Sequence, residues 1–94
     1  MAEDDVTEQE LIDALSRLQV SDLLVQTLST VSSLAYHRLD EENRDLEQAR
    51  LAIEAIRALV PVLSGSIPPE LQRDFEQVLA NLQLAYASAV EPAS

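Results

Sequence analysis

Two stretches with the same apolar spacing decide the fold of this chain: residues 46–63, LEQARLAIEAIRALVPVL, and residues 69–89, PELQRDFEQVLANLQLAYASA. The repeating apolar residues are Leu46, Ala49, Ile53, Ile56, Val60 and Leu63 in the first stretch and Leu71, Phe75, Val78, Leu82, Ala85 and Ala89 in the second. Steps of three and four place each set on one stripe of an α-helix. The segment 64–68 between them is long enough only to reverse the chain. The pattern therefore predicts an antiparallel helical hairpin over residues 46–89.

Pro61 lies near the end of the first stretch and disturbs the helix there, because it lacks an N–H and its ring crowds the carbonyl of Arg57. We expect the helix over residues 46–63 to kink or stop at Pro61 and to close with a distorted turn that ends at residue 63 or 64. Gly65 then suits the C-terminal cap. Pro69 suits the first position of the next helix, where the missing N–H would have no helical partner.

Two further helices are predicted upstream of the hairpin, over residues 8–18 and about residues 22–39. Thr7 begins a capping-box pattern before the first, Ser21 can cap the second, and Asp45 can cap the first helix of the hairpin. We expect the helix over 8–18 to bury an apolar face made of Leu11, Ile12, Leu15 and Leu18. The sequence thus predicts an all-α fold, a small four-helix arrangement.

The chain has 94 residues, enough for one domain with a modest core. We expect residues 1–6 to form a disordered acidic tail, residues 7–90 a single helical domain, and residues 91–94 a frayed C-terminus. A β-sheet is disfavoured, because the chain has one Gly and no Asn-Gly or Asp-Gly turn.

The charge of the chain narrows the range of partners. Seventeen acidic residues against six basic ones give a formal net charge of −11. Nucleic acids and anionic membrane surfaces attract Lys and Arg, so neither is expected as a partner. A basic protein remains compatible with this charge. The six basic residues are all Arg, a composition associated with high-GC bacterial genomes.

Cysteine is absent, which removes disulfides, thiolate nucleophiles and the usual structural zinc sites. The first residues are acidic where a secretory signal would be basic. No apolar run approaches the roughly 18 residues of a membrane-spanning helix. We therefore expect a cytoplasmic protein.

The hairpin has more apolar surface than its seam accounts for. Leu51 and Leu59 lie off the stripe of the first helix, and Leu84 lies off the stripe of the second. Tyr36 and Tyr86 each follow Leu-Ala, and we expect both at the edge of the core or at a subunit interface with the hydroxyl in water. These five residues are the candidate interface. Surplus apolar surface on a small protein favours association, here a homo-oligomer with a dimer favoured.

Several segments carry a family resemblance. DLEQARLAI at residues 45–53, VLANL at residues 78–82 leading to Tyr86, and SSLA at residues 32–35 are similar to a small bacterial family, domain of unknown function 1844. The similarity covers most of residues 20–90. It implies an all-helical cytoplasmic domain and implies no activity, cofactor or site residue.

Catalytic chemistry has few candidate residues. His37 is the only histidine, and as a general acid or base it would need an orienting carboxylate and a pocket. We favour a simpler role for it, as a cation beside Arg38 at the C-terminal end of a helix. The acidic residues in segment 40–45 lack the ligand spacing and central Gly of a calcium loop. We predict no catalytic, cofactor-binding or metal-binding residue.

Three functions can be ranked from these features. The first is a non-catalytic helical protein-interaction domain that self-associates. The alternative is an acidic adaptor or regulator that binds a basic protein, with the N-terminal acids and residues 40–42 steering the encounter. The remote alternative is an enzyme using His37.

Overall fold

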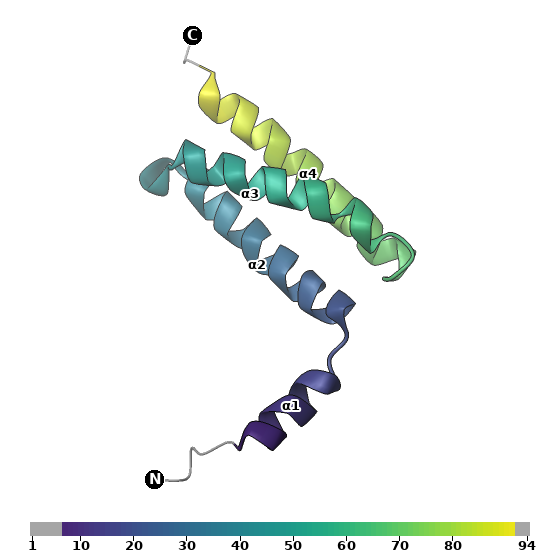
Figure 1. Cartoon of the computed structure of the whole chain (residues 1–94). Coiled ribbons are helices and arrows are strands. Elements are labelled where there is room, and N and C mark those ends of the chain that lie inside the picture. The colour runs from purple at the N-terminus through teal and green to yellow at the C-terminus, as the bar shows by residue number, and fades with distance from the viewer. Residues whose placement is uncertain (1–6, 92–94) are drawn as a thin grey trace.

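A computed structural model describes residues 7–91 of the chain. Within this range the chain forms four α-helices and two 3-10 turns, with no strand, which confirms the all-α fold (Figure 1). The elements are α1 (Glu8–Ser16), α2 (Val20–Leu39), η2 (Glu41–Asn43), α3 (Leu46–Leu59), η3 (Pro61–Leu63) and α4 (Pro69–Val90). The predicted tail over 1–6 lies outside the described residues. So does most of the predicted frayed end, of which only Glu91, the C-cap of α4, is described.

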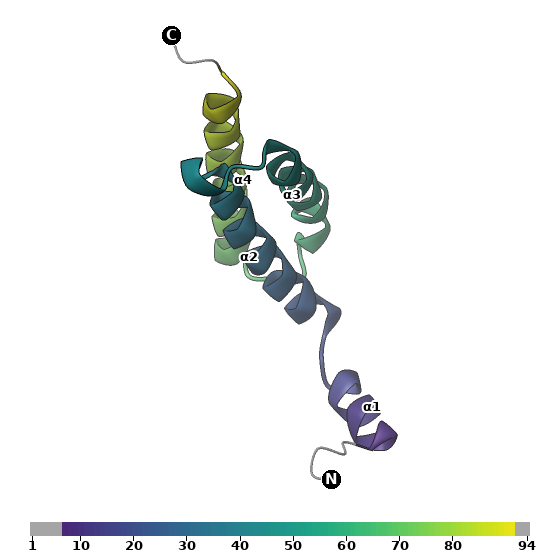
Figure 2. The same ribbon diagram turned by 90° about the vertical axis from the view of Figure 1, so that its left-hand side faces the viewer.

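The helices α2, α3 and α4 form a three-helix body in which each contacts the other two (Figures 1 and 2). The helix α3 returns along α2, and α4 returns along α3. The core contains Leu28 and Ala35 of α2, Ile56 of α3 and Leu82 of α4, all fully buried. All twelve stripe residues of the hairpin are either buried or packed partly buried against this core. The predicted hairpin is therefore confirmed.

The helix α3 stops at Leu59 and does not continue through Pro61 as a kinked helix. The distorted last turn expected there is the tighter turn η3, which ends at Leu63. The cause is Pro61, which cannot donate to the carbonyl of Arg57. The backbone switches to the i→i+3 pattern, in which the Leu63 N–H donates to the Val60 carbonyl at 3.1 Å. Gly65 follows with a φ of 85°, the left-handed conformation expected of a cap.

Two other helix limits also differ from the prediction. The helix α2 begins at Val20, with Gln19 as its N-cap, so Ser21 lies inside the first turn and does not cap it. The Gln19 carbonyl accepts from the N–H groups of Asp22 and Leu23 at 3.0 and 3.3 Å, which starts the helix one residue before Ser21. The helix α1 ends at Ser16 instead of residue 18. It begins with the predicted capping box at Thr7.

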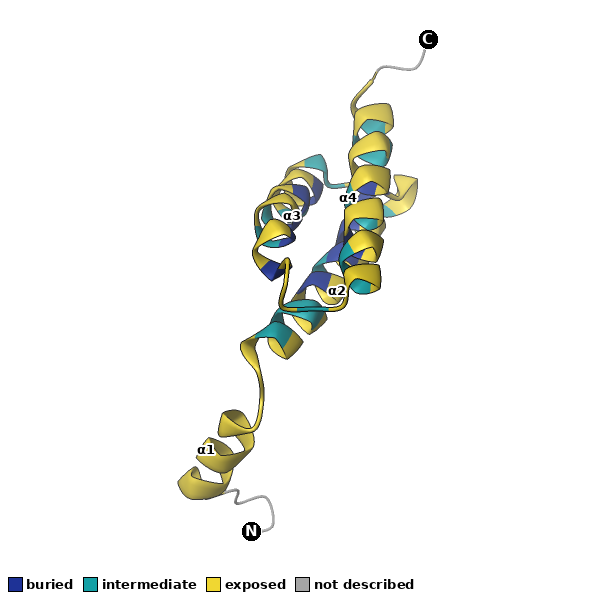
Figure 3. Ribbon diagram, turned by 90° about the vertical axis from the view of Figure 1, so that its right-hand side faces the viewer, coloured by how far each residue is buried: buried dark blue, intermediate teal, exposed yellow. Residues whose placement is uncertain are grey.

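The helix α1 lies apart from the body, beyond the N-terminal end of α2 (Figures 1 and 2). Each of its nine residues is exposed (Figure 3). The predicted burial of its apolar face is therefore wrong for this chain alone. Helical spacing gathers apolar side chains on one face, but a neighbouring element has to cover them, and residues 17–19 carry α1 away from the body.

Candidate interaction surface

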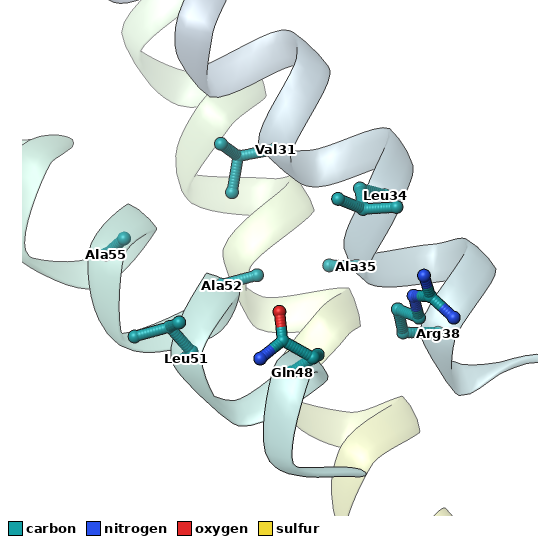
Figure 4. A pocket seen from close by; sticks show the side chains of 8 residues that line it. All are labelled: Val31, Leu34, Ala35, Arg38, Gln48, Leu51, Ala52 and Ala55. Atoms are coloured by element: carbon teal, nitrogen blue, oxygen red, sulfur yellow. The ribbon is translucent and has the colours of Figure 1, made fainter. Parts of the chain in front are cut away.

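A groove of about 200 Å³ lies between α2 and α3 (Figure 4). Its lining comes equally from Val31, Leu34, Ala35 and Arg38 of α2 and from Gln48, Leu51, Ala52 and Ala55 of α3. Nearly all of the lining surface is hydrocarbon. The groove therefore suits apolar side chains better than a polar small molecule, which needs converging polar groups.

Small side chains create this groove. Ala52 of α3 and Ala35 of α2 point toward each other across its floor (Figure 4), and methyl groups leave space that larger side chains would fill. Leu34 and Leu51 stand on opposite sides, with 49% and 62% of their surfaces exposed. The result is an apolar hollow with two aliphatic walls open to solvent.

One end of the groove is polar and held by hydrogen bonds. Arg38 and Gln48 lie there together (Figure 4). The Asp45 N–H donates to the Arg38 carbonyl at 2.8 Å, and the Asp45 carboxylate accepts from the Gln48 N–H at 3.2 Å. Asp45 therefore caps α3 as predicted. Next to it, the Arg44 guanidinium donates to the Leu39 carbonyl at 2.8 Å, which fixes the connection between α2 and α3.

A second apolar surface lies on α1. It consists of Leu11, Ile12 and Leu15 on the helix and of Leu18 just after it, each between 48% and 57% exposed. Three of the other six residues of α1 are acidic: Asp13, and Glu8 and Glu10 in its first turn. A one-sided apolar helix of this kind is typical of a segment that packs on a partner.

The structure does not gather the five predicted interface residues into one surface. Leu51 lines the α2–α3 groove, whereas Leu84 is exposed on α4 and Tyr36 is exposed on α2, both outside its lining. Leu59 packs partly buried against the core of its own chain. Tyr86 does the same and lines a separate hollow beside Arg57.

Sequence reasoning missed Leu34 and the exposure of the α1 face. Leu34 follows Val31 by three residues and precedes Arg38 by four, so all three fall on one face of α2. This spacing is the sequence signal that places Leu34 on the face of α2 beside the groove. It does not show that the facing residues of α3 are too small to cover Leu34.

His37 is exposed and belongs to neither the α2–α3 groove nor the hollow beside Tyr86. Close to it, the Asn43 amide donates to the Asp40 carboxylate at 3.3 Å. Among residues 7–91 no three His, Asp or Glu side chains gather closely enough to hold a metal ion. The geometry around His37 therefore supplies no support for the remote enzyme hypothesis.

None of the helices in the described range has the length and apolar character that crossing a membrane requires. No family model matches the chain, and no curated protein and no solved structure matches it either. The resemblance to domain of unknown function 1844 stays a prediction.

Proposed function

We propose that this protein is a non-catalytic helical interaction module that self-associates in the cytoplasm, with a dimer as the favoured assembly. The observation that carries the proposal is the α2–α3 groove, whose walls Leu34 and Leu51 are open to solvent. Contiguous apolar surface on a small protein is typical of an association site.

The helix α1 adds to the surface that is available to a protein partner, since each of its nine residues is exposed. A standard interface removes about 800 Å² of surface from each partner.

The molar mass in solution tests this proposal directly. We expect light scattering at micromolar concentration to report about 21 kDa, twice the 10.4 kDa of one chain. A constant mass of 10.4 kDa up to a concentration of about 100 μM would overturn the proposal.

Charge supports a second candidate function, the acidic adaptor for a basic protein. In the described part of the chain, Glu8, Glu10 and Asp13 lie exposed on α1, and Glu41 and Glu42 lie exposed on η2. Such clusters accelerate the encounter with a positively charged partner.

Affinity capture from lysate at low and high salt tests this function. A control chain has the five acids changed to Gln or Asn. Basic partners that are no longer captured at high salt, and that the control chain does not capture, would favour the adaptor function. Capture of the same partners at high salt and by the control chain would exclude it.

A further inference from the structure

We infer that α1 of each chain packs across the α2–α3 groove of a second copy, so that two copies exchange their α1 helices in a two-fold symmetric dimer. The inference rests on the self-association proposed above and names its contacts. It joins two apolar surfaces that are exposed in the described part of the chain: the four-residue face of α1 and the groove walled by Leu34 and Leu51.

The helix α1 needs a partner in order to be stable. It has nine residues, whereas isolated helices shorter than about 12–15 residues are marginal in water. Its capping box satisfies two N–H groups at the start but supplies no packing. Each apolar side chain on its face is exposed to water. A groove that accepts this face would supply the missing packing.

The groove of the same chain is out of reach for α1. Residues 17–19 attach α1 to the N-terminal end of α2, while the groove begins at Val31. At 1.5 Å per residue, Val31 lies about 16 Å along α2 from Val20, and α1 from Ser16 back to Glu8 covers only about 12 Å. If α1 folded back along its own α2, it would therefore end about one turn before the groove.

A second copy with an antiparallel α2 removes this mismatch. The helix α1 projects beyond the N-terminal end of α2 (Figures 1 and 2). The groove lies along the C-terminal half of α2, from Val31 to Arg38. In an antiparallel pair that overlaps at the N-terminal ends of its two α2 helices, each α2 runs from the two-fold axis in the direction in which the other copy's α1 projects. Each α1 then extends over the other copy's groove, and the symmetry forms both contacts at once. Val20 and Leu23, both exposed at the start of α2, lie close to the two-fold axis in this arrangement.

Charge fits the same orientation. In the antiparallel pair, the first turn of α1 lies toward the polar end of the facing groove. That turn carries Glu8 and Glu10, and that end carries Arg38. The opposite charges meet at the rim, while the apolar residues meet over Ala35 and Ala52, an arrangement typical of specific interfaces. The groove also has a suitable size, since cavities of about 150 Å³ accept a benzene ring.

The absence of cysteine in the chain allows a clean crosslinking test. Full-length chains carrying Leu15→Cys are mixed with chains carrying Leu51→Cys, and a short bismaleimide is added at a concentration where the wild type is dimeric. We expect the mixture to give a covalent heterodimer at least ten times faster than a matched mixture of Leu15→Cys with Val62→Cys. Val62 is 63% exposed, close to the 62% of Leu51, but does not line the groove.

The possible outcomes distinguish the helix exchange from the self-association on which it rests. If the wild type is a dimer and the two mixtures react at equal rates, the helix exchange is wrong and self-association stands. If the wild type is a monomer, both are wrong.

A chain with both Leu15→Cys and Leu51→Cys tests whether α1 docks on the groove of its own chain. A crosslinked product of single-chain mass would overturn the exchange, and a product of twice that mass supports it.

Discussion

At the residue scale, one serine on α2 is buried together with its hydroxyl group. Ser32 on α2 is 7% exposed, and its Oγ has no hydrogen-bond partner among the described residues. A buried polar group without a partner loses its hydration and gains nothing in exchange. Position 32 is therefore a place where a smaller, apolar side chain would stabilise the body.

We predict that Ser32→Ala raises the free energy of unfolding by about 1 kcal/mol, from the removed hydroxyl and from the better helix propensity of Ala. Chemical denaturation followed by circular dichroism measures it. Ser33→Ala is the matched control, because Ser33 is exposed on the same helix and gains the propensity alone. Equal effects of the two substitutions would show that the Ser32 hydroxyl costs nothing.

A substitution at Gly65 should affect stability through the backbone conformation and not through packing. Its φ is 85°, and a Cβ added there would meet no atom within 4 Å. We predict that Gly65→Ala lowers the free energy of unfolding by about 1 kcal/mol, solely through the left-handed conformation. Gly65→Asn should lose less, because Asn tolerates that conformation better. Thermal denaturation compares the two. An Asn variant that is less stable than the Ala variant would argue against this cause.

At the scale of elements, the hairpin could be predicted and the position of α1 could not. The steps of three and four in residues 46–89 encode which side faces inward, and the turn is too short to allow any neighbour but the adjacent helix. The same spacing in α1 identifies an apolar face but does not show which element packs on that face. The limits near Pro61 and Ser21 depended on competing backbone hydrogen bonds. The exposure of Leu51 could be predicted from its position off the stripe, but that of Leu34 required knowledge of the alanines that face it.

A substitution at Thr7 tests whether α1 becomes ordered when it docks on a second copy. Its hydroxyl accepts from the Glu10 N–H at 3.1 Å. Loss of such a cap costs about 1 kcal/mol, and a dimer contains two copies of α1. We therefore predict that Thr7→Ala weakens the dimer by about tenfold or more, measured by sedimentation equilibrium. Thr27→Ala, at an exposed position on α2, serves as the control and should leave the dissociation constant unchanged. Equal dissociation constants for both variants would mean that α1 is not ordered by docking.

At the scale of the whole molecule, the assembly and the stability of the chain are linked. The three-helix body has its own core, but α1 gains packing only from a second copy in the arrangement inferred above. A partner that binds only the folded chain stabilises it by mass action. The stability of this protein should therefore depend on its concentration.

We predict that the melting temperature rises by a few degrees when the protein concentration increases from about 5 to 50 μM, because each tenfold increase favours the dimer by about 1.4 kcal/mol. Circular dichroism in cells of different path length measures both samples. Leu51→Glu, which places a charge in the groove, should remove the dependence. A melting temperature that is the same at both concentrations for the wild type would contradict the linkage.

We propose that the chain self-associates through the groove between α2 and α3. Sedimentation equilibrium tests this on three full-length chains: the wild type, Leu51→Glu and Val62→Glu. The two variants add the same charge at equally exposed apolar positions, one in the groove and one outside it. We predict that the wild type and Val62→Glu are dimers of about 21 kDa and that Leu51→Glu is a monomer of 10.4 kDa. A Leu51→Glu chain that dimerises as tightly as the wild type would contradict the claim.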